Sequence, residues 1–127
     1  IHQKLSAAMA AVLFAVERAE VISAIGCHTT LKAGASNLDK IVFIADKIRW
    51  DQCGDPPYLV DMRGAAEHCL DRAACVYLEY LLSIRSELLV LHPWVEQAYR
   101  QLAGSIARTE ISGHTQPAPS ASANAGS

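Results

Sequence analysis

Hydrophobic residues recur every three or four positions along most of this chain, which is the period of an amphipathic helix. In the first segment Leu5, Met9, Val12, Leu13 and Val16 follow this spacing, with helix-favouring alanines between them. The pattern predicts a helix whose apolar face is buried. Strand-type alternation and internal repeats are not evident in the sequence. We therefore predict an all-α fold.

The same criteria predict the remaining elements and their boundaries. We expect helices at residues 19–27, from 36 to 47 or 48, 58–91 with a break near 69–71, and 94–107. Ser36 and Asp39 have the spacing of a capping box at the start of the third helix. Asp71 is positioned to cap the piece after the break, and Pro93 suits the first turn of the last helix.

Two segments lack helical periodicity. Residues 50–57 contain Gly54 and the pair Pro56-Pro57, which predict a loop. Residues 112–127 consist almost entirely of small and polar residues with nothing to bury, which predicts a disordered tail. The foldable part is then residues 1–111. Because the chain begins with Ile1 inside a helical pattern, we expect the natural protein to have residues upstream.

Composition narrows the possible partners. With 127 residues and 51% hydrophobic residues, the chain can bury a core without disulfide bonds. A net charge of −2 lacks the basic footprint of nucleic-acid binders, so we expect no nucleic-acid partner. No run is long and apolar enough to predict a membrane span. The cysteines Cys27, Cys53, Cys69 and Cys75 form no C-x-x-C pair, so we expect a reduced, cytoplasmic protein, either monomer or homodimer.

Three polar residues fall where burial is expected, and a buried imidazole or carboxylate needs a partner. His2 lies on the apolar face of the first helix, His28 extends that of the second, and Asp46 that of the third. Together they would suit a divalent metal. A lone histidine on an apolar face is more often a satisfied core residue, however. For Asp46 the alternative is a salt bridge to Lys47 or Arg49, although these neighbours point to other sides of the helix.

Other polar residues carry weaker signals. His92, before Pro93, is predicted to cap or pack at a helix start, and His68 to lie on a solvated face. Lys32, like Lys47 and Arg49, could meet phosphate oxygens beside a metal. Lysine and arginine side chains more often lie alone on the surface without contacting a ligand.

The sequence HTTLKAGASNLDKIVFIADKIRWDQ at residues 28–52 resembles the YqeK-type HD-domain proteins, in which an HTT motif is followed by a helix ending in Ala-Asp. Ile1-His2-Gln3 stands at the distance of that family's Leu-His-Gly motif, 26 positions before the HTT histidine. LHPWVEQAY, from Leu91, resembles the family's closing helix. The similarity covers roughly residues 1–105, and the combined spacings are more specific than any single motif.

The resemblance implies an HD-domain helical bundle and a metal-dependent hydrolase of nucleotide phosphoanhydrides, with symmetrical cleavage of diadenosine tetraphosphate to two ADP. It implies two divalent metal ions, irons by that resemblance, that activate a water. His2, His28 and Asp46 would be metal ligands, and Asp46 with Lys47 would be catalytic. Thr29, Lys32 and Arg49 would bind substrate. The family's first ligand histidine and its His-Asp doublet lie upstream of the region matched, and this chain contains no His-Asp dipeptide.

Departures from the family pattern fall in loops expected to contact substrate. Leu31-Lys32 replaces Gly-Arg after the two threonines, Gln3 replaces a glycine, and the residues after Ile48 differ as well. Two alternatives therefore stay open. One is an HD-type phosphohydrolase acting on another nucleotide, in NAD metabolism, and the other is a non-catalytic helical module that binds a nucleotide or a partner helix.

Overall fold

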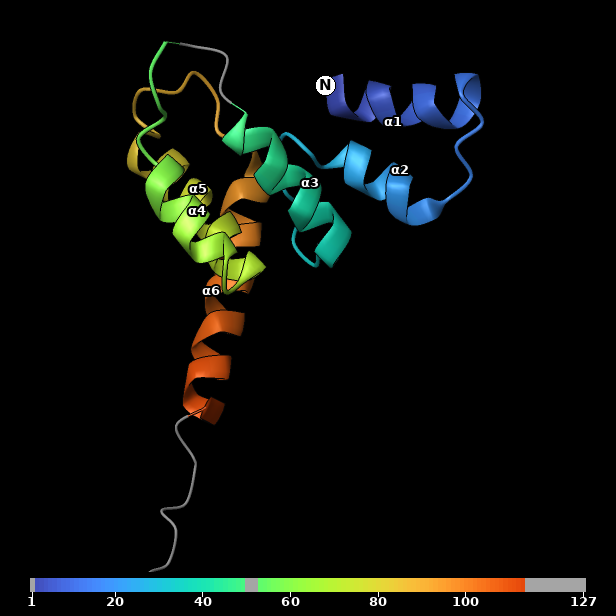
Figure 1. The fold of residues 1–127 in the computed structure, drawn as a ribbon. Helices are drawn as coiled ribbons and strands as arrows, with labels where there is room; N and C mark the ends of the chain where they lie inside the picture. The colour runs from blue at the N-terminus through green and yellow to red at the C-terminus, as the bar shows by residue number, and fades with distance from the viewer. Residues whose placement is uncertain (1, 50–52, 114–127) are drawn as a thin grey trace, which may run out of the picture.

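The computed structural model of the chain describes residues 2–49 and 53–113, and within them every regular element is a helix (Figure 1). The predicted all-α class is confirmed. The helices are α1 (His2–Leu13), α2 (Ala19–Gly26), α3 (Asn37–Ile48), α4 (Leu59–Ala66), α5 (Leu70–Ser83) and α6 (Pro93–Gly113). Residues 50–52 of the predicted loop and residues 114–127 of the predicted tail lie outside the described residues.

The hydrophobic core is centred on α5, which packs against α3, α4 and α6. Ala73 and Ala74 on α5 are completely buried, so that the neighbouring helices approach its backbone closely. Phe43 from α3 and Leu102 from α6 fill the space on either side. The hydroxyl of Tyr58, just before α4, donates to the backbone carbonyl of Lys47 over 3.1 Å and so ties the end of α3 to this core.

The α1–α2 hairpin lies to one side of this bundle, and α2 connects it to α3 (Figure 1). The side of α1 that faces inward carries small residues and one amide. Gln3 and Ala10 are buried, and Ala7 lies against Gly26 of α2, where an added Cβ would stand 3.8 Å from the Ala7 Cβ. Small side chains at spacings of four and three allow the two helices to pack closely.

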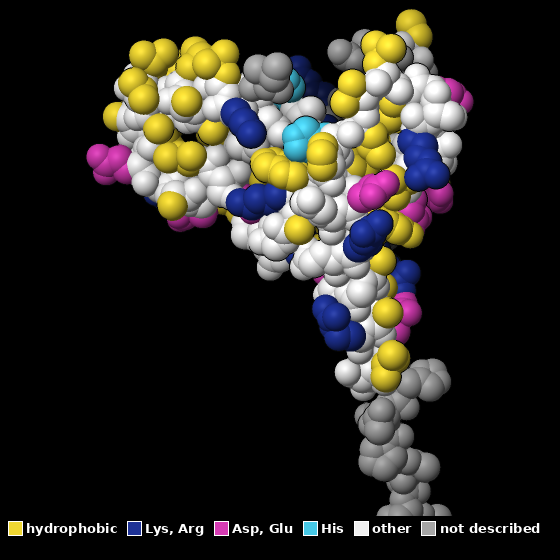
Figure 2. All heavy atoms as spheres, turned by 180° about the vertical axis from the view of Figure 1, so that it is seen from behind, with side chains coloured by type: hydrophobic (Ala, Val, Ile, Leu, Met, Phe, Trp, Pro, Cys, Tyr) yellow, Lys and Arg dark blue, Asp and Glu magenta, His cyan; other side chains and the backbone are white. Residues whose placement is uncertain are grey.

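The larger apolar side chains of α1 face outward, contrary to the prediction that they are buried. Leu5, Met9, Val12 and Leu13 are all exposed, with Val12 retaining 79% of its accessible surface. Figure 2 shows the resulting cluster of hydrophobic side chains over the α1 end of the molecule. The hydrophobic pattern identified the helix correctly, but the alanine side of α1 is the one that packs.

The helix α1 ends three residues earlier than the hydrophobic spacing suggested, because the chain reverses at Ala15. This residue has a φ of 50°, and the backbone N–H of Val16 donates to the carbonyl of Ala10 over 3.0 Å. A left-handed conformation is unfavourable for a residue with a Cβ.

Replacing Ala15 with glycine is therefore expected to raise the free energy of unfolding by about 1 kcal/mol. Chemical denaturation would measure this change. The exposed Ala8 in the middle of α1 provides the matched control, because Ala8→Gly at an ordinary helical position should lower stability by about 1 kcal/mol. A loss of stability in both variants would contradict the strained turn.

Some of the predicted helix caps and boundaries are confirmed and others are wrong. The capping box exists, with Ser36 N–H donating to Asp39 Oδ2 over 2.9 Å and Asp39 N–H donating to Ser36 Oγ over 3.1 Å. Pro93 occupies the first position of α6, as predicted.

Asp71 does not cap α5, because its carboxylate pairs with Lys40 at 2.6 Å instead. Helix α5 ends at Ser83, so residues 84–92 form a loop that the periodicity failed to reveal. Residues 112 and 113, assigned to the tail, belong to α6.

The four cysteines differ in their exposure. All four are free, and Cys27 and Cys75 are buried in the core. Burial raises the pKa of each of these two thiols to about 11, so they remain protonated and unreactive at neutral pH. In the described ranges no helix is both long and apolar enough to cross a membrane.

Candidate functional site

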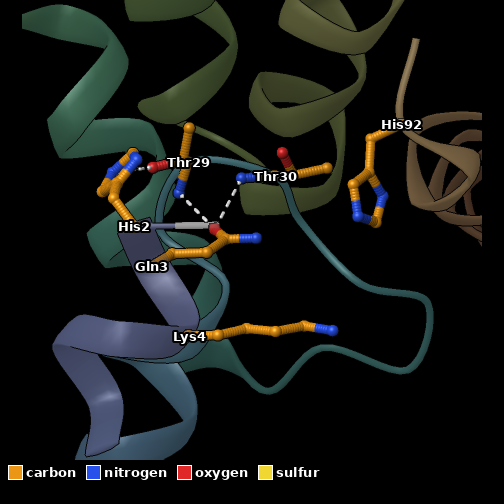
Figure 3. Close-up of a pocket in the computed structure, with 6 residues that line it drawn as sticks. All are labelled: His2, Gln3, Lys4, Thr29, Thr30 and His92. Atoms are coloured by element: carbon orange, nitrogen blue, oxygen red, sulfur yellow. Dashed lines mark hydrogen bonds between the residues drawn. The ribbon is translucent and has the colours of Figure 1, made fainter. Parts of the chain in front are cut away.

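One pocket is lined by several of the residues that the sequence analysis identified as candidates. It has a volume of about 180 Å³, and it lies where the start of α1, the loop after α2 and the residues just before α6 meet (Figure 3). Its lining residues are His2, Gln3, Lys4, Thr29, Thr30 and His92. The site therefore joins three segments that are far apart in the sequence.

Gln3 fastens the threonine loop to α1. Its Oε1 accepts hydrogen bonds from the backbone N–H groups of Thr29 and Thr30, both over 3.1 Å, and its side chain is almost completely buried. Two donors that converge on one atom require an oxygen there, which fixes the orientation of the amide. The sequence identified Gln3 only as a departure from a family motif, yet it organises the loop.

The structure brings His2 and His28 together. Their ring centroids are 5.3 Å apart in an edge-to-face arrangement, and His2 Nε2 lies 2.9 Å from Thr29 Oγ1. His28 Nδ1 lies 2.6 Å from the carbonyl oxygen of Ile25, which only accepts hydrogen bonds. In the neutral tautomer that fits this contact the proton is on Nδ1, which leaves the lone pair of Nε2 for a ligand.

Neither histidine is fully buried, contrary to the helical-wheel prediction. His2 is exposed at the edge of the pocket, and His28 is half-buried. His2 is exposed because the apolar face that it shares on α1 points outward. Both rings remain accessible to a ligand, as a core histidine would not be.

Asp46 is also exposed, and the salt bridge that we discounted exists. Its carboxylate is 2.7 Å from Lys47 Nζ, and 45% of its side chain is exposed. The buried face of α3 passes through Phe43, Ile44 and Lys47, so the adjacent Asp46 points away from the core. The burial argument for Asp46 was therefore wrong.

Lys47 lies in a setting that a surface lysine rarely has. Its side chain is buried, with Nζ 5.1 Å from the ring centre of Phe43 and 5.2 Å from that of Tyr77. The aromatic faces and the Asp46 carboxylate together compensate the buried charge. Lys47 thus contacts the core and Asp46, and it does not line the pocket.

The other residues that were predicted to contact the substrate differ in whether they line the pocket. Thr29 lines the pocket, whereas Lys32 does not. Lys32 Nζ donates to Ser23 Oγ over 2.6 Å and lies 3.7 Å from the buried carboxylate of Asp39, so it braces the loop against α2 and α3. Arg49 is an exposed residue directly after α3.

His92 and Lys4 are pocket residues that the sequence reasoning missed. The prediction that His92 caps a helix is confirmed, since its Nδ1 accepts the backbone N–H of Trp94 over 3.2 Å. Its ring also lines the pocket, and Lys4 reaches the same region with Nζ 5.8 Å from the centre of the Trp94 ring. The Leu-His-Pro sequence was the available signal for His92, while nothing distinguished Lys4.

The donor chemistry of the site fits a divalent metal only in part. Two imidazoles with accessible rings, one of them oriented by a backbone carbonyl, are suitable ligands. In residues 2–49 and 53–113 no group of three or more His, Cys, Asp or Glu side chains is placed to hold a metal ion. The histidine pair is thus a partial ligand set, and Asp46 does not complete it in this conformation.

Comparisons with known proteins support the fold. No protein-family model matches the sequence. An uncharacterised Lactococcus lactis subsp. cremoris protein, from the region 5′ of pepC, is 40% identical over 106 residues, which are 84% of this chain and 53% of that protein. The crystal structure of a predicted HD superfamily hydrolase involved in NAD metabolism, from Clostridium acetobutylicum, superposes with a TM-score of 0.74 at 24% identity.

This second match covers 83% of this chain and 55% of the Clostridium acetobutylicum chain. The chain therefore has the helical fold of that HD superfamily protein, and it spans about half the length of both relatives.

Proposed function

We propose that this chain belongs to a metal-dependent phosphohydrolase of the HD type and that His2 and His28 are two of its metal ligands. The observation that carries the proposal is the histidine pair, held edge to face with rings 5.3 Å apart on a fold shared with an HD superfamily protein. The carbonyl of Ile25 and the hydroxyl of Thr29 would orient the two rings for coordination. A bound divalent metal, iron by the family resemblance, would polarise a phosphoryl oxygen and lower the pKa of a water.

For the substrate we propose a compound in which phosphoanhydrides join two nucleosides, with symmetrical cleavage of diadenosine tetraphosphate to two ADP as the first reaction to test. The pocket beside the histidines contains donors and no acidic residue among its lining side chains, which suits phosphate oxygens. The Clostridium acetobutylicum protein is described as involved in NAD metabolism, which supports NAD-related dinucleotides as the second substrate class.

Asp46 remains a candidate third ligand. Its carboxylate is accessible, but a metal would have to share it with the ammonium of Lys47, 2.7 Å away. We propose that Lys47 positions this carboxylate, while Thr29 binds substrate from within the pocket. Lys32 and Arg49 could reach a substrate only beyond the pocket lining.

The test is the metal content of the natural full-length protein, measured by elemental analysis. We expect about two metal ions per chain, as in two-metal hydrolases, and loss of metal in His2→Ala and His28→Ala. His68→Ala is the matched control because His68 is exposed and is not among the residues that line the pocket. Asp46→Ala shows whether this residue is a ligand. A folded protein that binds no added divalent metal, or a His28→Ala variant that keeps all of it, would refute the proposal.

A further inference from the structure

We propose that Gln3, Lys4 and His92 form a phosphate-binding subsite beside the histidine pair. The subsite would hold a phosphate group of the substrate, and for the identity of that substrate the inference rests on the proposed function. Gln3 and Lys4 directly follow His2 on α1, so a phosphate bound by them would lie next to the candidate metal ligands (Figure 3).

The first observation is an amide donor whose orientation is fixed by the fold. Because Gln3 Oε1 accepts the N–H groups of Thr29 and Thr30, the amide nitrogen must point to the other side. Gln3 as a whole is only 5% exposed, but its Nε2, which has no acceptor among the described residues, is not a sealed atom and opens into the pocket. Figure 3 shows it directed away from the loop, toward the space bounded by Lys4 and His92. A donor that is held in one orientation and opens into a pocket is available to an acceptor oxygen of a ligand.

The second observation is that the facing groups are also donors. His92 Nδ1 accepts the backbone N–H of Trp94, so the proton of the neutral ring is on Nε2, where it can be donated to a ligand. Lys4 contributes an ammonium group, steadied by the face of Trp94 at 5.8 Å.

These donors select the kind of ligand. The six lining residues include no Asp or Glu, and Lys4 would repel a metal cation. A ligand that satisfies the amide, the ammonium and the imidazole N–H must present several acceptor oxygens and negative charge. A phosphate group has this chemistry, and the volume of about 180 Å³ accommodates it.

Trp94 provides a direct measurement of binding. Its ring lies 5.0 Å from the His92 ring and close to Lys4, so an anion that engages either residue will change its fluorescence. In a Trp50→Phe background of the 127-residue chain, Trp94 is the single tryptophan. Inorganic pyrophosphate is the probe, titrated at constant ionic strength against chloride because surface electrostatics depend on salt.

The decisive variant is Gln3→Glu. Glutamate has the same shape and keeps an oxygen for the N–H groups of Thr29 and Thr30, but it replaces the donor with a negative charge. We expect pyrophosphate affinity to fall at least about tenfold, as for the loss of one hydrogen bond to a charged group. Lys4→Gln should weaken binding similarly.

Gln101→Glu is the matched control. Gln101 Oε1 also accepts a backbone N–H, that of Gly34 over 3.0 Å, and the substitution adds the same charge outside the pocket. Its affinity for pyrophosphate should equal that of the parent chain. Far-ultraviolet circular dichroism of each variant verifies that the helices are intact.

No fluorescence change with pyrophosphate, or equal weakening by Gln3→Glu and Gln101→Glu, would overturn the subsite. The measurement needs no metal, so the two proposals fail separately. Metal binding by the full-length protein without pyrophosphate binding would reject the subsite alone. Pyrophosphate binding that depends on Gln3, in a protein that binds no metal, would keep the subsite and reject the hydrolase.

Discussion

Replacing Phe43 with alanine is expected to lower the free energy of unfolding by about 3–5 kcal/mol, the usual cost of removing a buried phenyl ring. Phe43 is completely buried. Its ring packs edge to face with Tyr77 at 5.6 Å and supports the ammonium of Lys47 on its face. The substitution would thus leave a cavity in the core and also remove part of the compensation for a buried charge. Urea denaturation followed by circular dichroism would measure the loss.

The chain provides its own control, because its second phenylalanine, Phe14, is 74% exposed. Phe14→Ala should change stability by less than about 0.5 kcal/mol, as surface substitutions usually do. Equal losses in the two variants would mean that the core is not centred where α3 meets α5.

Replacing Asp39 with alanine should cost about 2–4 kcal/mol, since it removes both a helix cap and a hydrogen bond to a charged group. Asp39 is 1% exposed, accepts the N–H of Ser36 and lies 3.7 Å from Lys32 Nζ. Its loss would release the start of α3 from the loop that carries the two threonines of the pocket. Thermal and urea unfolding should both report it. Asp61→Ala is the control, because Asp61 lies in the first turn of α4 but is exposed.

The stabilisation by Asp39 should also depend on pH. Burial alone would raise the pKa of its carboxyl group, but the hydrogen bond from Ser36 and the positive charge of Lys32 bring it below its ordinary value of 3.8. Because the pKa is lower in the folded chain, the contribution is complete above the unfolded-state pKa and is lost as the pH falls through the folded-state pKa. The stability difference between the parent chain and Asp39→Asn should therefore shrink in acid. A difference that stays constant down to the lowest pH at which the chain folds would exclude this charge effect.

Features that depend on local chemistry could be predicted from the sequence. Ser36 and Asp39 form a capping box because both partners lie within one turn, and Pro93 begins α6 because its missing N–H costs nothing there. His2, His28 and Asp46 were expected to converge from three helices. The structure brings the two histidine rings together, but among the described residues Asp46 does not join them in a group that could hold a metal ion.

Features that depend on which helix face packs could not be predicted. The spacing of Leu5, Met9 and Val12 defines a face, but the choice between that face and the alanine face of α1 is made by the close approach of α2. The helical periodicity of α3 placed Asp46 on the same apolar face as Val42 and predicted that this face is buried. The structure instead buries the neighbouring face, which carries Phe43, Ile44 and Lys47. His92 was assigned only a capping role because its place opposite Gln3 depends on the tertiary fold.

The peripheral position of α1 links ligand binding to local unfolding. This helix packs chiefly against α2, yet it supplies His2, Gln3 and Lys4 to the pocket. When α1 detaches, the paired imidazoles separate and the phosphate subsite is dismantled. Any ligand that bridges α1 and the threonine loop binds only the docked state, and by mass action it must suppress that opening. The backbone amides of α1 should then exchange with deuterium more slowly in the liganded chain, while the exchange of the amides of α5, at the centre of the core, should change little.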